Sequence, residues 1–472
     1  MKNPNKTTKI LNNTLRLKKL MLMLLFCFPS VLFAKDYNIS DYGAVGNGTT
    51  VNTIAIQKAI DDCTKTGGTV LISNGVFITG TIYLKDNVNL KIEAGATLKG
   101  SGDINDYTTD TYKHMYKDEF DINRCLIFAK DAQNITISGG GTVDGNAKVF
   151  PVKDDKDENR PMVFRFVACT RLKMLDIFIT NTPSWATAWL YCTDIVVDRV
   201  TINSTELYTN DCLDFDGCVN VRVSNCDFSA SDDCLSLQSS RKDKPCRDIT
   251  ITNCTFTSKW DAIRIGLLSR GNIENITVSN CVFKEIGHVG IQFELCEGGE
   301  MGNMVFNGLS MQNVRVPIYM ALYQQRAAVD APMEMAPIGK MKGFIFSNIT
   351  CKFEKLRSDC PAFKEGITPK NSLIFISGLP GHKIEDVQIN NMILETNGGA
   401  TKKDFQNVKV PELDLKYIKN WWAGMYPFDR DSIVLPANGV YARHVKGLKL
   451  NNVVVTTRNP DERPNFVIID GK

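Results

Sequence analysis

A short internal repeat constrains the fold of this chain more than any other feature. Three consecutive segments, residues 219–238, 248–266 and 275–294, each begin with alternating apolar residues, turn at an Asn-Cys pair and end in a second short strand. The cysteines of these pairs, Cys226, Cys254 and Cys281, are 28 and 27 residues apart. A unit this short cannot bury its own apolar face and must stack on its neighbours. The repeat therefore predicts an all-β solenoid of stacked coils, built as one elongated domain.

Alternation along the strands predicts which side chains leave the coil. In residues 212–216, Leu213 and Phe215 should face the interior, whereas Asp214 and Asp216 should face outward. Equivalent strands of neighbouring coils stack about 4.8 Å apart, so outward side chains of successive repeats should form columns. One column is predicted to hold Asp214, Ser236, Arg264 and Gln292, and the next Asp216, Gln238, Gly266 and Glu294.

The N-terminal residues have the pattern of a signal peptide. Residues 1–20 contain six basic side chains and no acid, and an apolar run follows that ends at Ala34. This run is too short to span a bilayer, so we expect residues 1–34 to be removed and the chain to be exported, to the periplasm or the medium, without a membrane span. A single membrane anchor is the alternative. Removal would change the net charge from +3 to −3, which argues against a nucleic-acid partner.

Residues 35–472 are expected to form the solenoid, with a cap at about residues 35–66. The cap should contain an amphipathic helix that covers the open end of the stack, with Asn52 as its N-cap and Ile54, Ile56, Ala59 and Ile60 as its apolar stripe.

Three stretches interrupt the strand pattern and are expected to leave the coils beside a substrate site: residues 106–160, 324–341 and 398–436. Most cysteines are expected to be small buried side chains between coils, and none has zinc-site spacing, so no metal is predicted.

Acidic residues gather at the turns of the middle coils. Asp232 and Asp233 are adjacent, and Asp211 lies one coil earlier at the same place relative to its strand as Asp233. Neighbouring carboxylates shift each other's pKa apart, and one protonated and one ionised carboxyl are the minimum for cleaving a glycosidic bond. Structural calcium binding or turn capping is the alternative for these acids.

The chain resembles glycoside hydrolase family 28, the polygalacturonase-like pectinase family. The resemblance covers nearly the whole chain after residue 34 and includes GGGTVDGN, NTPSWATAWL, TNDCLDFDGC and SASDDCLSLQS. It implies a single-stranded right-handed parallel β-helix and a hydrolase that needs no cofactor. It also implies that Asp232 is the general acid and that Asp211 and Asp233 activate water in an inverting reaction. The glycines that the family has beside these acids are replaced here by Cys212 and Ser231.

Two further departures concern substrate binding. Where the family has His-Gly on the next coil, this chain has Trp260 and Asp261, and the family's Arg-Ile-Lys, which grips a galacturonate carboxylate, is matched by residues 292–294, Gln-Phe-Glu. A glutamate in place of that lysine would repel a uronate. The candidate substrate-binding residues are therefore Asp214, Trp260, Asp261, Arg264, His288, Gln292 and Glu294; Arg264 could compensate for the lost lysine, and His288 could enter the site or be structural.

The leading functional prediction is an exported glycosidase that cleaves α-glycosidic bonds in pectic polysaccharide or its oligosaccharides, exo-acting and monomeric. An α-L-rhamnosidase or another neutral-sugar glycosidase of the same family is the first alternative. A polysaccharide lyase is a second, although a lyase needs a basic side chain and usually calcium, and an Asp-Asp pair with no paired Arg or Lys suits it badly. A glycan-binding protein without catalysis is the third.

Overall fold

The computed structural model describes residues 35–112, 123–150, 160–323, 336–355, 357, 359, 369–414, 416–417 and 433–471. The chain divides into Met1–Lys35 and Asp36–Lys472, and the description below concerns the second unit. The expected leader and parts of all three expected excursions lie outside the described residues. In the described part of the chain, no helix is long and apolar enough to cross a membrane.

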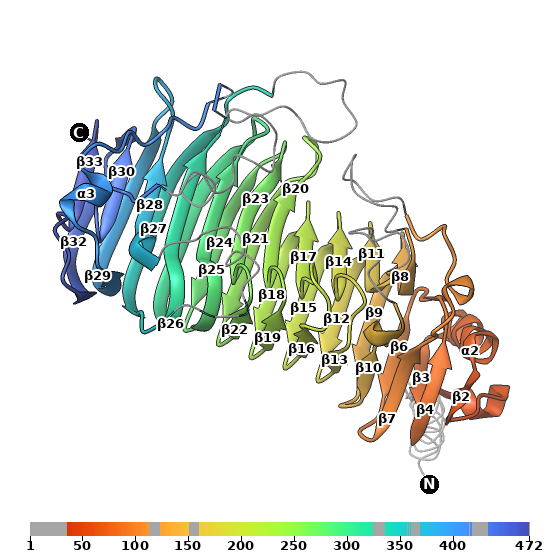
Figure 1. The fold of residues 1–472 in the computed structure, drawn as a ribbon. Coiled ribbons are helices and arrows are strands. Elements are labelled where there is room, and N and C mark those ends of the chain that lie inside the picture. Colours follow the sequence, from red (N-terminus) through yellow and green to blue (C-terminus); the bar gives the residue numbers. More distant parts are fainter. Residues whose placement is uncertain are drawn as a thin grey trace, which may run out of the picture. The chain divides into compact units, whose positions relative to one another are not determined.

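Asp36–Lys472 is a right-handed parallel β-helix whose strands stack in register along three sides (Figure 1). The first side, called the site sheet below, consists of β5 (Ile82–Tyr83), β8 (Cys125–Lys130), β11 (Met162–Val167), β14 (Thr187–Leu190), β17 (Leu213–Asp216), β20 (Leu235–Ser239), β23 (Ile263–Ser269), the ends of β25 (Val282–Leu295) and β26 (Glu300–Leu322), β28 (Ile374–Ser377), β30 (Val440–Arg443) and β33 (Phe466–Ile469).

The other two sides have the same parallel order. The second side contains β1 (Lys35–Asn38), β3 (Gly68–Ile72), β6 (Val88–Ile92), β9 (Gln133–Ser138), β12 (Thr170–Leu175), β15 (Thr193–Asp198), β18 (Val219–Ser224), β21 (Cys246–Thr252), β24 (Ile273–Ser279), the start of β26, β27 (Lys340–Lys352), β29 (Ile384–Gly398), β31 (Val445–Lys446) and β32 (Lys449–Asn459). The third contains β2 (Asn47–Val51), β4 (Gly75–Thr79), β7 (Ala96–Gly100), β10 (Thr142–Asp144), β13 (Phe178–Thr180), β16 (Thr201–Ser204), β19 (Asp227–Ala230), β22 (Thr255–Ser258), the start of β25, the middle of β26 and the C-terminal parts of β27, β29 and β32. Short helices connect some strands: η1 (Ile39–Tyr42), η2 (Ile104–Asp106), η3 (Ala147–Val149), η5 (Pro369–Asn371) and α3 (Lys402–Phe405).

The Asn-Cys pairs of the repeat lie where the second side turns into the third. Asn225, Asn253 and Asn280 have φ of 57°, 56° and 54°, a left-handed conformation that asparagine tolerates better than most residues. The Asn253 side-chain amide donates to Asn225 Oδ1 on the preceding coil at 3.3 Å. The cysteine that follows points into the core, and all thirteen cysteines among the described residues are buried and unbridged. The prediction of small packed thiols is confirmed for these residues.

The first predicted column of outward residues is confirmed. Register pairs Asp214 with Ser236, Ser236 with Arg264 and Arg264 with Gln292. The second column is interrupted: Asp216 pairs with Gln238 and Gly266 with Glu294, but the register shifts after Leu237. Gly266, with φ of 111°, lies within this irregular stretch of β23. Within the coils, the alternate residues of these strands belong to the continuous apolar core.

The predicted N-terminal helix exists as α2 (Thr53–Thr66). Its buried residues are Ile56, Ala59, Ile60 and Cys63, whereas Ile54 is 74% exposed, so the expected stripe was wrong at that position. Asn52 is the N-cap residue but its side chain does not cap the helix. It accepts from the Val45 amide at 2.7 Å and donates to the Thr50 carbonyl at 2.7 Å instead, because the preceding turn competes for the same amide.

Two expected excursions were drawn too wide. β8, β9 and β10 lie inside residues 106–160, because the alternating apolar residues of 125–144 belong to a coil, and β27 begins at Lys340, inside 324–341.

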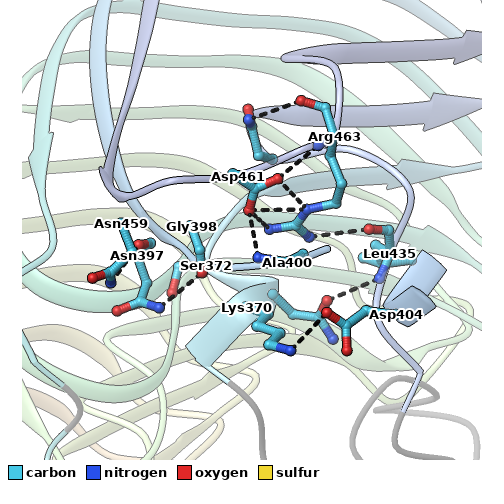
Figure 2. A network of polar contacts seen from close by, with 12 residues as sticks. Lys370, Ser372, Asn397, Gly398, Ala400, Asp404, Leu435, Asn459, Asp461 and Arg463 are labelled. Carbon is cyan, nitrogen blue, oxygen red and sulfur yellow. Dashed lines mark hydrogen bonds and ion pairs between the residues drawn. The ribbon is translucent and has the colours of Figure 1, made fainter. Parts of the chain in front are cut away.

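The stretch 398–436 is tied to the last coil by a polar network (Figure 2). Asp461 forms a buried ion pair with Arg463 at 2.8 Å and accepts from the Ala400 amide at 3.0 Å, while Arg463 donates to the Leu435 carbonyl at 3.0 Å.

Candidate active site

Backbone hydrogen bonds between coils align three aspartates just before the strands of the site sheet. The amide of Cys212 donates to the Asp233 carbonyl at 3.0 Å, and that of Cys234 donates to the Asp261 carbonyl at 3.0 Å. Asp211, Asp233 and Asp261 therefore occupy one position on three consecutive coils. The position before them holds Asn210, Asp232, Trp260 and, on the fourth coil, His288.

The three predicted catalytic acids converge. One carboxylate oxygen from each of Asp211, Asp232 and Asp233 lies within 4.8 Å of the others. The Asp233 amide donates to Asp211 Oδ1 at 2.8 Å, which joins the two coils at this point. Asp211 and Asp233 are buried and Asp232 is half-buried. This spacing is also short enough for the three oxygens to bind one divalent cation.

The protein environment favours protonation of these acids. Burial and the neighbouring Asp233 charge raise the pKa of Asp232 to about 8. Burial raises the pKa of Asp233 to about 7, and the Arg264 guanidinium, 3.0 Å from its Oδ2, acts in the opposite direction. Burial also raises the pKa of Asp211 and of Asp214 well above the usual range. Arg264 pairs directly with Asp233, so its charge stabilises the ionised form of that carboxyl, whereas burial and the Asp233 charge favour a protonated Asp232.

Arg264 lies at the centre of the first outward column and contacts three carboxylates. Besides Asp233, its Nη2 is 3.8 Å from Asp261 Oδ2 and its Nε is 3.7 Å from Glu294 Oε2. Burial raises the pKa of both Asp261 and Glu294 to about 7, and the charge of Arg264 acts against that rise. Arg264 is only 7% exposed, so its guanidinium is engaged by the protein's own acids.

Trp260 and Asp261, predicted to lie where the family has histidine, both contact His288. Asp261 Oδ1 is 2.6 Å from His288 Nδ1 and accepts from the Val289 amide at 2.8 Å. The rings of Trp260 and His288 are stacked, with centroids 4.3 Å apart and planes at 14°. His288 and Asp261 are buried, whereas Trp260 is half-buried. An imidazole is therefore present, but it comes from a later coil.

The remaining predicted residues, Asp214 and Gln292, lie in the same column as Arg264 and are buried. The structure thus brings all ten predicted site residues onto four consecutive coils. Their individual roles in binding substrate remain predictions.

Sequence reasoning assigned no role in the site to three residues that support it. Ser236 donates to Asp233 Oδ2 at 3.2 Å, and it is the column neighbour of Asp214. Arg160 lies over the Tyr208 ring and donates to Thr209 Oγ1 at 2.7 Å, which secures the turn before Asp211. Arg315 is buried on the coil after His288, and its charge lowers the pKa of Asp261. Column position could have identified Ser236 and Arg315, but Arg160 follows an irregular stretch and carries no periodic signal.

The raised pKa values of the acids in the site predict how the stability of the protein varies with pH. Asp232, Asp233 and Glu294 retain protons in the folded protein up to about pH 7 to 8, whereas unfolded carboxyls lose them near pH 4. Between these limits the folded state binds more protons, so the free energy of unfolding should fall as pH rises, by about 1.4 kcal/mol per pH unit for each extra proton bound. Calorimetry should show a melting temperature that decreases from pH 5 to pH 8. An increase over that range would contradict these protonation states.

Comparison with known proteins supports the family suggested by the motifs. The family model for glycosyl hydrolases family 28 matches residues 63–414. An exo-poly-α-D-galacturonosidase of Dickeya chrysanthemi is 27% identical over 338 residues, covering 59% of this chain and 56% of the relative. A probable polygalacturonase of Vitis vinifera is 23% identical over 308 residues, covering 61% and 63%. The chain thus spans about three-fifths of the length of these relatives.

Solved structures show the same fold. A family 28 exopolygalacturonase of Yersinia enterocolitica superposes with a TM-score of 0.66 at 19% identity, covering 93% of this chain and 79% of the other. An exopolygalacturonase of Thermotoga maritima gives a TM-score of 0.62 at 21% identity, covering 77% and 87%. Because the family model matches about three-quarters of the chain, this protein belongs to glycosyl hydrolases family 28.

Proposed function

We propose that this protein hydrolyses α-glycosidic bonds in pectic polysaccharide or its oligosaccharides. The observation that carries the proposal is the convergence of Asp211, Asp232 and Asp233 from two coils within 4.8 Å. The relatives named polygalacturonase and exo-poly-α-D-galacturonosidase support the substrate class.

In the proposed reaction, Asp232 donates its proton to the leaving glycosidic oxygen. Its pKa of about 8 keeps it protonated at neutral pH, and its half-exposed side chain can reach a substrate. Asp233, paired with Arg264, takes a proton from the attacking water, and Asp211, whose raised pKa keeps it protonated, helps to position that water. The water's oxygen then bonds to the anomeric carbon as the bond to the leaving sugar breaks.

Inversion of the anomeric carbon is part of the proposal and follows the family resemblance. The nearest carboxylate oxygens lie closer than the separation of about 6.5–9.5 Å usual between inverting carboxyl groups, so geometry alone does not support it. Proton NMR of the first-formed product decides the point. Inversion yields the β-anomer from an α-linked substrate, and an initial α-anomer would instead assign a double displacement.

The binding subsite is proposed to differ from that of a uronate-specific enzyme. Glu294 lies at the position that matches the family's lysine, and Arg264, in the neighbouring column, is engaged by the protein's own acids. This observation favours, as a second candidate, a neutral-sugar glycosidase such as an α-L-rhamnosidase. The half-buried indole of Trp260 is proposed to offer an apolar face to a sugar ring beside Asp232.

A substrate panel tests the function. The full chain should be incubated with polygalacturonan, rhamnogalacturonan oligosaccharides and aryl α-glycosides, each with and without EDTA. New reducing ends that are insensitive to EDTA, without absorbance near 235 nm, are expected. Unsaturated products lost on chelation would assign a lyase, and binding without any turnover would assign a glycan-binding protein.

Glu294→Gln tests the altered subsite. Loss of this carboxylate removes its repulsion of a uronate and leaves Arg264 with one partner fewer, so galacturonate oligosaccharides should bind about three- to tenfold more tightly by calorimetry. Glu300→Gln, on the exposed start of β26, is the matched control and should change nothing. Unchanged or weaker binding in Glu294→Gln would show that Glu294 does not face the sugar's carboxylate.

Export to the periplasm or the medium and a monomeric state complete the proposal. Export rests on the basic and apolar composition of residues 1–34. Cell fractionation and light scattering test the two statements.

A further inference from the structure

The hydrogen bonds around Asp261 indicate which partner carries the proton. Asp261 Oδ1 accepts from the Val289 amide at 2.8 Å and lies 2.6 Å from His288 Nδ1, while Oδ2 faces Arg264 at 3.8 Å. One oxygen of this group already accepts a backbone N–H, and the other faces a guanidinium. Both contacts favour the ionised form, so Asp261 is best described as a carboxylate. Nδ1 of His288 is then the donor, and the imidazole is hydrogen-bonded to an anion.

Each acid of the site that ionises adds a negative charge and favours a second proton on this ring. The site contains six carboxyl groups, those of Asp211, Asp214, Asp232, Asp233, Asp261 and Glu294. Among the described residues, the guanidinium groups whose charges act on them are those of Arg264 and Arg315. The flat stacking of Trp260 on His288 adds an aromatic face, which attracts a cation more strongly than a neutral ring.

We propose that His288 is a positioning residue for the carboxyl groups of the site. As an imidazolium, His288 is the counter-ion of Asp261, so the Arg264 guanidinium remains available to stabilise the ionised form of Asp233. The role deepens the proposed hydrolysis and acts through Asp261 and Arg264 rather than on the substrate. Asp261 or Trp260 is predicted to lie where the family has histidine, and in this chain an imidazole reaches both residues from the next coil.

The geometry shows what would change without the imidazolium. Arg264 Nη2 lies only 3.8 Å from Asp261 Oδ2, so an uncompensated Asp261 would compete with Asp233 for the same guanidinium. Asp233 would then be harder to ionise, and water activation would need a higher pH.

Other charged residues on the strands packed against His288 also influence its protonation. Arg315, on the coil after His288, opposes a positive imidazole, whereas Glu285 and Glu294 on the strand of His288 favour it. Lys259 and Arg264 lie on the preceding coil. These groups are unchanged in the substitutions below, so the comparison between variants isolates the His288–Asp261 pair.

Histidine-selective ¹⁵N NMR of the full chain tests the protonation state independently of any enzymatic activity. The chain has four histidines, and the His288 signals are identified by their loss in His288→Gln. In the wild-type protein both ring nitrogens are expected to be protonated at pH 7. In Asp261→Asn the ring should become neutral by that pH, as an ordinary histidine does. A neutral His288 in the wild-type protein between pH 5 and 7 overturns the proposal, whether or not a substrate has been found.

The pH dependence of kcat/KM tests the positioning role. His288→Gln should move the acidic limb upward by about one pH unit. The double variant His288→Gln/Asp261→Asn should move the limb back toward the wild-type value, because no unpaired Asp261 remains to draw Arg264 away. A purely structural role would lower the rate equally at every pH and make the double variant no better than His288→Gln. That result, or an unmoved limb in His288→Gln, contradicts the proposal.

Discussion

Asp232→Asn should lower kcat by about 10²- to 10⁴-fold and leave the fold intact. The substitution removes the one proton that the proposed mechanism delivers to the leaving oxygen, and general acid catalysis typically contributes a factor of this size. Stability should not fall, because Asp232 is half-buried and its carboxyl is disfavoured as an anion in this site. Initial rates and melting temperature, measured at pH 5 to 7, give both numbers.

A matched control separates this effect from a general loss of charge. Asp227 lies in β19 of the same coil and is exposed, so Asp227→Asn should retain wild-type activity. A substrate with a good leaving group, such as a nitrophenyl glycoside, should recover much of the rate in Asp232→Asn, since it needs little protonation. Near-normal turnover of the natural linkage by Asp232→Asn would remove Asp232 from the role of the acid.

Arg264→Met should destabilise the protein by about 3–5 kcal/mol at pH 8 and abolish hydrolysis. Arg264 faces Asp233, Asp261 and Glu294, and removal of one partner from a buried ion cluster leaves the opposite charges uncompensated. The loss should be much smaller at pH 5. Asp233 and Glu294 have pKa values near 7 even with Arg264 present, so both become neutral at low pH.

Chemical unfolding of Arg264→Met at pH 5 and pH 8 measures this difference. Arg222→Met is the control: Arg222 is exposed on β18 and donates to Asn220 Oδ1, so its loss should cost little at either pH. A pH-independent loss in Arg264→Met would mean that packing, not charge, accounts for the role of this side chain.

Much of the fold could be predicted because the repeat is local in the chain. The spacing of Cys226, Cys254 and Cys281 set the length of a coil, and strand alternation placed Asp214, Ser236, Arg264 and Gln292 in one column. The family motifs added the three acids. The prediction was less accurate where the period breaks, as in 125–144, where three strands had been assigned to an excursion.

The interactions between side chains of the site could not be predicted from the repeat. The sequence suggested Arg264 as a replacement for the missing lysine, but the folded chain surrounds it with three of its own carboxylates. His288 was one candidate among several until its Nδ1 was seen 2.6 Å from Asp261. Burial, which raises the pKa of each acid, depends on everything packed around it and has no local sequence signal.

Periodic side chains were enough to establish the coil, its apolar interior and the alignment of Asp211 with Asp233, because stacking strands in register converts a linear repeat into a spatial column. Packing between coils decided the remainder: which acid keeps its proton, where Arg264 places its charge and which coil supplies an imidazole. Those outcomes depend on distances of 3 to 4 Å between residues some 30 positions apart, and such distances exist only once the coils have closed on one another.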